Sequence, residues 1–407
     1  MKILLIHDVQ AYKQNGVSVS LGILADELKK AGHDVRILTL SDDIHSVKDE
    51  RDDYLLGSLP CPIYPGIRMR LRRSSPYVRE LAAWNPDVIH TNCEFSTFRI
   101  ARLLQRKCEK RPHWVHTFHT DYRYYMGIFS KSRTMTDKVL PRFLDYCIKR
   151  VDVLIVPTVK IRDYILSADF DFAGSPYNTV IIPTGIDFTE LAADATVDRA
   201  ALRASLGVPH DAKLVIFLGR VSVEKNLEEL VDDFAAYRKK HDDVYLLVVG
   251  SGPYEETLRK NVAKKGLTDR VIVHGGVPHD KIGDYYRASD VFASASVSET
   301  QGLTFYEAMY CGLPVLAKDR ACLAEAVTEG ENGAYFDDEA SFEASLDLLL
   351  SKKAADGGTI VKKLPSCFES AVFAKSVANV YRDLLEKDEN GGETAEKKEQ
   401  RCPHDRL

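Results

Sequence analysis

The chain has 407 residues, 45% of them hydrophobic, and a formal net charge of -5 at pH 7. This length and hydrophobic content indicate two or three domains' worth of core and exclude a fibrous or generally disordered chain. No apolar run approaches the ~20 residues that cross a bilayer. The first residues reach a polar loop after only a short apolar run, 3–6, which fits a strand and not a signal peptide. We therefore expect a cytoplasmic protein, and we place it peripherally on the cytosolic face of a membrane on the basis of the basic stretch described below.

Through residues 1–187, short apolar runs alternate with helical patterns, and we assign this stretch to a first domain. Strands are predicted at 2–7, 34–40, 88–92, 113–119, 152–157 and 179–183, and helices over 17–28, 98–104 and 140–148. Alternating strands and helices predict a parallel, doubly wound sheet. Ligands of such sheets bind outside the carboxyl ends of the strands.

Polar residues cluster at those strand ends, at 8–18, 90–92 and 116–122. In the first cluster, Gly16 lets the backbone approach a phosphate without an intervening Cβ, although Asn15-Gly16 also fits an ordinary turn. In the third, His119 is placed to donate to a sugar hydroxyl or to take part in proton transfer, or else it is structural. Strand alternation sends His116 to the face opposite His113 and His119.

A second domain is predicted over residues 188–368. Its strands are expected at 214–218, 244–249, 271–274, 291–296 and 314–317, with helices starting at 226, 254, 281 and 301. An amphipathic helix over 369–386 and a disordered tail over 387–407 complete the chain. The fold class is therefore α/β, with two doubly wound domains.

The stretch 298–312 combines a strand end, a polar turn and a helix that we expect to begin near Gln301. Backbone N–H groups at such a helix start bind anions such as a diphosphate. Glu299 and Glu307 flank this start. Carboxylates repel phosphate, so the two glutamates are better suited to binding hydroxyl groups on either side of a bound diphosphate.

Arg220 and Lys225 follow the first strand of the second domain, where both can reach one diphosphate. The alternative is a solvated turn. Gly250 and Gly252 also follow a strand, but the third glycine of a dinucleotide-binding fingerprint is missing.

A basic stretch interleaves Arg68, Arg70, Arg72 and Arg73 with Met69 and Leu71. It lies in residues 66–150, which hold 18 Lys and Arg against 7 Asp and Glu. Such a mixture suits an anionic membrane surface; a solvated basic face and an RNA-binding face are the alternatives. With no recognised nucleic-acid module, we favour membrane contact and expect no nucleic-acid partner.

Together these motifs resemble a retaining glycosyltransferase of the GT-B fold, in the large GT4 family, over nearly the whole length to about Leu385. Glu299 and Glu307 match the family's E-x7-E pattern, and Gly219-Arg220 with Lys225-Asn226 match its phosphate-binding segment. The resemblance implies two Rossmann-like domains facing a cleft, with the final helix crossing back to the first.

The resemblance also implies roles for the site residues. The donor is a nucleotide sugar, expected to be UDP-linked, and no metal or other cofactor is required; the eight cysteines, without any C-x-x-C pair, give no sign of a zinc site. By this resemblance Arg220 and Lys225 neutralise the diphosphate, and Gln301, Gly302 and Leu303 supply backbone N–H groups to it. Glu307 binds the ribose and Glu299 binds the donor sugar. Gly16 contacts the diphosphate from the first domain, and His119 lines the donor-sugar and acceptor side.

Within the family, Asn15-Gly16-Val17 and residues 119–122 look most like members that glycosylate lipids, including diacylglycerol glucosyltransferases and related mannosyltransferases. Tyr12-Lys13 departs from the proline often found there. The expected reaction is hexose transfer to a membrane lipid such as diacylglycerol. A polysaccharide or soluble acceptor and a non-catalytic nucleotide-sugar-binding protein are the alternatives. The oligomeric state, and the choice between front-face displacement and a covalent intermediate, stay open.

Overall fold

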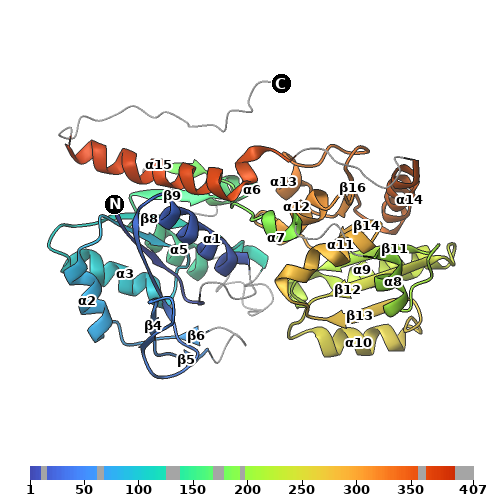
Figure 1. The fold of residues 1–407 in the computed structure, drawn as a ribbon, viewed down its shortest axis with the longest axis horizontal. Coiled ribbons are helices and arrows are strands. Elements are labelled where there is room, and N and C mark those ends of the chain that lie inside the picture. Colours follow the sequence, from blue (N-terminus) through green and yellow to red (C-terminus); the bar gives the residue numbers. More distant parts are fainter. Residues whose placement is uncertain are drawn as a thin grey trace. The chain divides into compact units, whose positions relative to one another are not determined.

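The computed structural model describes residues 1–10, 16–61, 68–124, 138–167, 178–192, 198–355 and 364–389. The chain divides into two compact units (Figure 1), unit 1 of Met1–Ile186 with Ser366–Leu407 and unit 2 of Asp187–Pro365. Each contains a largely parallel sheet covered by helices, so the expected α/β class with two Rossmann-like domains is confirmed. The expected tail, from 390 onward, lies outside the described residues.

In the described part of unit 1, the main sheet has the strand order β10-β9-β8-β7-β1-β2-β4-β3. The strands are β1 (Lys2–Ile6), β2 (Asp34–Leu40), β3 (Val47–Lys48), β4 (Tyr54–Leu56), β7 (Val88–Thr91), β8 (His113–Thr117), β9 (Val153–Val156) and β10 (Thr179–Ile181). All neighbours pair in parallel except β3 with β4. A separate antiparallel pair, β5 (Leu59–Pro60) and β6 (Arg68–Met69), was not predicted. Strands of two residues show no period that a sequence pattern can reveal.

Helices cover both faces of this sheet, and alternation along β1 decides which side chains meet them. The helices are α1 (Gly16–Lys30), α2 (Pro76–Trp84), α3 (Ser96–Lys107), α5 (Leu140–Ile148), α6 (Val159–Ile165) and α15 (Ser370–Glu389), with a 3-10 turn at Ser366–Phe368. Ile3 and Leu5 join the core beneath α1 and α15, whereas Leu4 and Ile6 join the core beneath α2 and α3.

Helix α15 packs beside α1 on the same face of the unit 1 sheet (Figure 1), as expected of the final helix. It runs to Glu389, three residues beyond the expected end at 386. Glu, Lys and Asp continue the pattern there without a Gly or Pro stop signal, and the first glycine of this region is Gly391.

In unit 2 the described strands follow the order β13-β12-β11-β14-β15-β16, and all neighbours are parallel. They are β11 (Lys213–Leu218), β12 (Val244–Val249), β13 (Val271–Gly275), β14 (Val291–Ser294), β15 (Val315–Ala317) and β16 (Gly333–Tyr335). The chain order reverses between β11 and β14. The carboxyl ends of these two strands therefore form the crevice where doubly wound sheets bind ligands.

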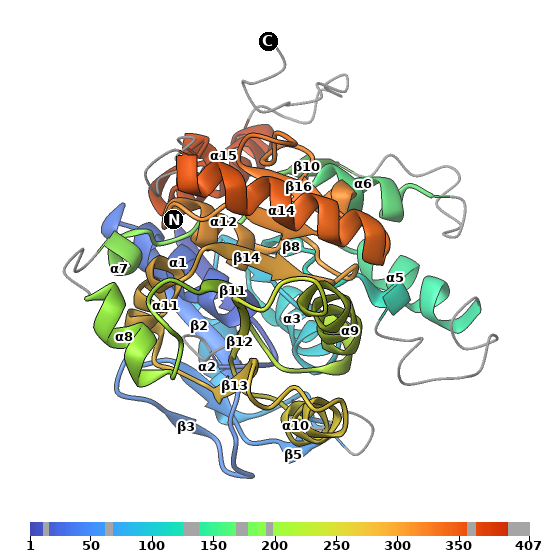
Figure 2. The same ribbon diagram turned by 90° about the vertical axis from the view of Figure 1, so that its right-hand side faces the viewer.

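The faces of the unit 2 sheet are covered by different sets of helices (Figure 2). The helices are α7 (Thr189–Ala192), α8 (Arg199–Ser205), α9 (Leu227–Arg238), α10 (Glu255–Lys264), α11 (Ile282–Ala288), α12 (Leu303–Tyr310), α13 (Arg320–Leu323) and α14 (Glu339–Ala355), with 3-10 turns at Val223–Lys225 and His279–Lys281. Helices α9, α10 and α14 share one core with the strands, while α11 contacts α8 and α12. In the described residues no helix is both long and apolar enough to span a membrane.

Candidate functional site

The reversal point of unit 2 brings together side chains from the loops after β11 and β14. Nζ of Lys225 lies 2.6 Å from Oε1 of Glu299, and the two side chains are 21% and 13% exposed. Arg220, in the same loop as Lys225, is exposed. The structure thus joins two predicted site residues that are 74 positions apart, with a third on the same loop.

Contacts between the two loops hold this pair in place. Oγ of Ser298 donates to the carbonyl oxygen of Glu224 at 3.1 Å. Asn226 adopts a left-handed conformation, with φ of 52°, and its amide nitrogen lies 3.4 Å from the carbonyl oxygen of Ala295. These two hydrogen bonds join the loops directly beside Lys225 and Glu299. The backbone of both loops, and not only the conformation of the two side chains, therefore keeps the pair together.

Helix α12 begins at Leu303, two residues later than predicted, because Gly302 stands before it in the left-handed conformation with φ of 74°. No side chain caps the helix. Its first-turn N–H groups lack the side-chain acceptor that a Ser or Asp at the cap position gives, and the N–H of Phe305 donates to the carbonyl oxygen of Gly302 at 2.9 Å. Gln301, just before Gly302, is buried. This start has the geometry of an anion site, and the contribution of Gln301, Gly302 and Leu303 to diphosphate binding stays a prediction.

Glu307 lies on the second turn of α12 and is buried, unlike Glu299. The hydroxyl of Tyr286, from α11, donates to its Oε2 at 3.0 Å. Burial raises the pKa of the Glu307 carboxyl, while the charge of His279 and the Tyr286 hydrogen bond act in the opposite direction. Such a carboxyl keeps a fixed direction and is suited to binding hydroxyl groups, as expected for the ribose.

The Gly250-Ser251-Gly252 segment has a packing role. A Cβ on Gly250 would lie 1.8 Å from the carbonyl oxygen of Gly219, and one on Gly252 would lie 2.2 Å from that of Val221. The N–H of Val221 donates to the carbonyl of Ser251 at 3.0 Å. These glycines therefore allow the backbone of residues 250–252 to pack directly against the backbone of the loop that carries Arg220.

This packing makes a stability prediction. We expect Gly250→Ala to destabilise unit 2 by about 3 kcal/mol or more, because it adds a backbone clash to a positive φ of 139°. Gly266→Ala is the matched control. Its φ of 68° is also positive, but no atom lies within 4 Å of the added Cβ, so it should cost only about 1–2 kcal/mol. Urea unfolding measures both, and equal losses would contradict the packing role.

In unit 1 the chain order reverses between β1 and β7, and His119 lies at the carboxyl end of the adjacent β8. Its Nε2 is 3.0 Å from Oδ1 of Asn92, which follows β7. Burial, reinforced by His7, His116 and His90, holds the pKa of His119 well below its usual value. The ring is therefore neutral near pH 7. With the Asn92 amide placed so that Oδ1 faces Nε2, the matching tautomer carries the proton on Nε2 and has Nδ1 as an acceptor.

Other polar residues at this edge are structural. The Asp8 carboxylate accepts from the N–H groups of Ser96 at 3.0 Å and Thr97 at 2.7 Å, so it caps α3. Nδ1 of His90 is 2.5 Å from the hydroxyl of Tyr381 on α15. Gly16 is the first residue of α1, and the loop at 11–15 lies outside the described residues; the expected diphosphate contact of Gly16 stays a prediction.

The histidines of β8 point to opposite faces, as predicted. Nε2 of His116 is 3.1 Å from Oε1 of Glu94, and its ring packs edge-on against Phe98 of α3. Nε2 of His113 is 3.0 Å from Oδ2 of Asp388 on α15. Neither is therefore available at the carboxyl edge of the sheet.

The buried histidines predict acid sensitivity. Desolvation lowers the pKa of His7 to about 4 and of His90 to about 3. As pH falls below about 6.5 the unfolded chain binds protons that the folded chain does not, so stability falls with pH. We expect these two groups to remove about 2–3 kcal/mol between pH 7 and 5.5, with His119 acting in the same direction.

Urea unfolding at several pH values tests this expectation. His7→Gln should reduce the slope of unfolding free energy against pH by about 1.4 kcal/mol per unit. His210→Gln, at a side chain that is 80% exposed, should leave it unchanged. A pH-independent stability would show that the histidines bind protons as readily in the folded chain as in the unfolded chain.

The basic stretch is only partly available for a membrane. Nε and Nη2 of Arg68 bond to Ser58, and the guanidinium of Arg70 bonds to the carbonyl oxygens of Gly57 and Ser74. Arg68 and Arg70 therefore hold neighbouring backbone, and membrane contact by the four arginines stays a prediction. Arg72, Arg73 and the 67% exposed Leu71 remain on the surface.

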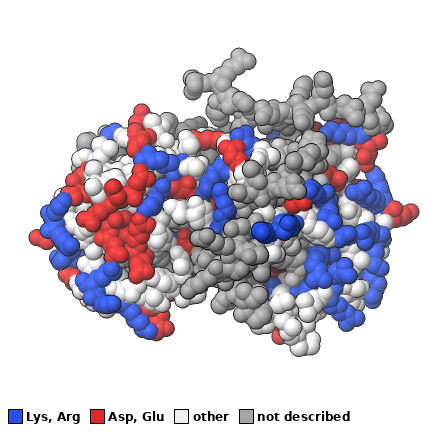
Figure 3. Space-filling model, turned by 180° about the vertical axis from the view of Figure 1, so that it is seen from behind, with Lys and Arg blue, Asp and Glu red and all other residues white. Residues whose placement is uncertain are grey.

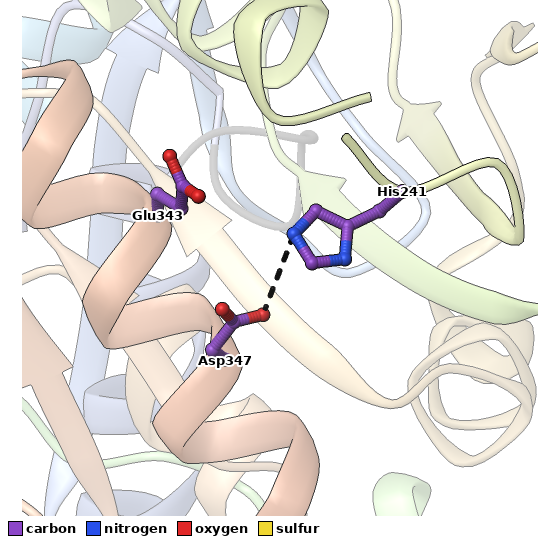
Figure 4. Close-up of side chains that lie close together, drawn as sticks. All are labelled: His241, Glu343 and Asp347. Atoms are coloured by element: carbon purple, nitrogen blue, oxygen red, sulfur yellow. Dashed lines mark ion pairs between the residues drawn. The ribbon is translucent and has the colours of Figure 1, made fainter. Parts of the chain in front are cut away.

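Figure 4 shows the one group of side chains in the described residues whose ligand atoms are close enough for a metal ion. It lies on α14 and just after α9, not on the loops after β11 and β14. His241, Glu343 and Asp347 have such atoms within 4.8 Å of one another. Glu343 is already paired with Lys240 at 2.6 Å, and Asp347 accepts from Tyr237 at 2.6 Å. Both carboxylates thus have protein partners, and a metal ion would have to displace them.

Comparisons with known proteins agree with this geometry. Residues 14–190 match the description Glycosyltransferase Family 4, and residues 198–357 match Glycosyl transferases group 1. The chain is 29% identical to the alpha-monoglucosyldiacylglycerol synthase of Streptococcus pneumoniae, over 95% of this chain and 86% of that protein. It is 28% identical to the synthase of the same name from Acholeplasma laidlawii, over 92% and 94%. The fold is similar to that of sucrose-phosphate synthase from Thermosynechococcus elongatus, with a TM-score of 0.75, 22% identity and coverage of 94% and 99%.

Proposed function

We propose that this chain, which belongs to the family 4 (group 1) glycosyltransferases of the GT-B fold, transfers glucose or a similar hexose to a membrane lipid such as diacylglycerol. The donor is a nucleotide sugar, UDP-linked, and the anomeric configuration is retained. The similarity to two alpha-monoglucosyldiacylglycerol synthases, over 92% or more of this chain, is the observation that carries the proposed acceptor.

The donor half of the proposal rests on unit 2. Negative charge develops on the departing diphosphate during glycosyl transfer, and donors fixed at that place stabilise the transition state most. Arg220, Lys225 and the uncapped start of α12 supply such donors at the reversal point of the sheet. These groups neutralise the leaving group without calling on a metal ion.

The Lys225–Glu299 pair gives the proposal a specific binding step. Without donor, the two charges neutralise each other at 2.6 Å in a partly buried setting. In the proposed complex, Lys225 turns to the diphosphate and Glu299 accepts from hydroxyls of the donor sugar. Glu307, held by Tyr286, accepts from the ribose hydroxyls.

The acceptor half of the proposal rests on unit 1. His119 lies at the ligand edge of its sheet with a neutral ring held by Asn92. Leu71, Arg72 and Arg73 place an apolar side chain and two cations on the surface. This combination suits peripheral binding to anionic lipid, to which each cation adds about 1 kcal/mol.

The test supplies the purified protein with UDP-glucose and vesicles that contain diacylglycerol. We expect a glucosylated lipid with the α configuration of the donor. Transfer to a soluble sugar but not to the vesicles would support the alternative of a soluble or polysaccharide acceptor. Donor binding with no transfer to any acceptor, by the unmodified chain and by Glu299→Ala alike, would support a non-catalytic nucleotide-sugar-binding protein.

A further inference from the structure

A basic pocket lies in unit 1, at the amino-terminal edge of the main sheet, opposite the carboxyl edge where His119 lies. It has a volume of about 310 Å³ and includes Trp114, at the start of β8, and Asp152, just before β9, in its lining. His119 follows the other end of β8. The five residues of that strand, at about 3.3 Å each, separate the two places.

Cations dominate the lining of this pocket. They are Arg102 and Arg106 of α3, Arg111 of the following loop, and Lys149 and Arg150 after α5. Arg102 and Arg106 are one helical turn apart and so share a face of α3. Two stretches that are distant in sequence, 102–111 and 149–150, therefore direct positive charge into one hollow.

Most of this charge is not neutralised by the protein. Arg102 and Arg150 bond to Tyr146, through its hydroxyl and its carbonyl oxygen respectively. No carboxylate of the described residues lies within 4 Å of Arg106 or Arg111. Lys149 pairs with Asp145 at 2.7 Å, and Asp152 accepts from the N–H of Trp114 at 2.7 Å. Within the described residues none of the four arginines forms an ion pair, and the lining holds five cations against one carboxylate, that of Asp152.

Pairing with the ends of helices explains only part of this arrangement. Cations in the last turn of a helix complement its dipole, which accounts for Arg106 and Lys149. It does not account for Arg111, which lies in a loop, or for the meeting of all five in a hollow. Basic side chains also predominate over unit 1 in the view of Figure 3. Like charges held together in this way are stabilised by binding an anion.

We propose that this pocket binds a phosphate group. Arginine's planar fork matches phosphate oxygens two at a time, and the volume lies at the small end of ligand pockets, about 300–1,000 Å³. The pocket thus has room for a phosphate headgroup. The group is carried by an anionic lipid headgroup or comes as free phosphate, and the two sources share this chemistry.

The test compares two double variants of the full-length chain. Arg106→Ala/Arg111→Ala removes two exposed pocket cations. Lys107→Ala/Lys110→Ala removes two exposed cations of the same segment that do not line the pocket. One assay is flotation with phosphatidylcholine vesicles, with and without phosphatidylglycerol. The other titrates inorganic phosphate against the fluorescence of Trp114 in a Trp84→Phe background, where it is the sole tryptophan.

We expect the pocket variant to lose about 25-fold in affinity, roughly fivefold for each cation, and the control to retain its affinity within about fivefold. Loss confined to vesicles containing phosphatidylglycerol identifies a lipid headgroup. Loss confined to the Trp114 response identifies free phosphate. Equal behaviour of the two double variants in both assays, or absence of binding by the unmodified chain in both, overturns the proposal. Neither assay depends on glycosyl transfer, so this outcome is separate from that of the proposed function.

Discussion

Lys225→Ala is expected to lower kcat by about 10²–10³-fold, the effect of removing one preorganised donor from a developing oxyanion. The ammonium group lies at the reversal point between β11 and β14, and the tether from Ser298 to Glu224 keeps its loop in place without it. The substitution also leaves Glu299 without its 2.6 Å partner. Donor binding should therefore weaken less than turnover, because the Glu299 carboxylate still accepts from sugar hydroxyls.

Steady-state kinetics with varied donor measure kcat and KM separately. Lys225→Arg should recover part of the loss, since a guanidinium keeps the charge but differs in shape and reach. Lys240→Ala is the matched control: it breaks a pair of the same length, 2.6 Å to Glu343, at a side chain that is 65% exposed. An increase in KM alone for Lys225→Ala, with kcat unchanged, would show that Lys225 binds the ground state and transition state equally.

Much of the scaffold of this site follows from sequence patterns. The strand at 244–249 was predicted with its observed bounds, and strand-by-helix alternation was sufficient to place Arg220, Lys225 and Glu299 at one edge of a sheet. The physical reason is that parallel strands buried on both faces are continuous apolar runs, which stand out in the sequence between polar segments. The short strand β16 lacks such a run and was missed.

Partners that arrive from distant elements could not be predicted. Tyr286, which orients Glu307, precedes it by 21 positions on another helix. Tyr381, which meets His90, is 291 positions away. Each such contact is fixed by how helices pack on the sheet, and no local pattern in the sequence marks the tyrosine. Glu299 and Glu307 are the same residue type in one motif, but their environments differ. Glu299 pairs with the ammonium group of Lys225, and Glu307 accepts from the Tyr286 hydroxyl.

The basic stretch shows a second limit. Arg68 and Arg70 are two positions apart, so along an extended segment they point to the same side. That side faces the backbone of Gly57 and Ser58. A pattern of alternating basic and apolar residues fixes which side chains share a side, but not whether that side meets solvent or the rest of the protein.

His119→Ala is expected to lower kcat by about 10²-fold, through loss of a fixed hydrogen-bond acceptor at the ligand edge of unit 1. Because burial keeps the pKa of His119 well below its usual value, its ring stays neutral as pH falls through 6.5. The kcat profile of the unmodified chain should therefore show no acid limb near pH 6.5 that is due to His119. His113→Ala is the control on the same strand. Its side chain bonds to Asp388 on α15, so kcat should be unchanged.

Asn92→Asp tests the origin of that neutrality. A carboxylate in place of the amide oxygen that now lies 3.0 Å from Nε2 would favour the charged ring and raise the pKa of His119. The kcat profile of this variant should gain an acid limb at a higher pH than in the unmodified chain, since protonation removes the Nδ1 acceptor. Loss of that limb in Asn92→Asp/His119→Ala would assign it to His119. An unchanged profile would mean that the ring does not contact the reacting groups.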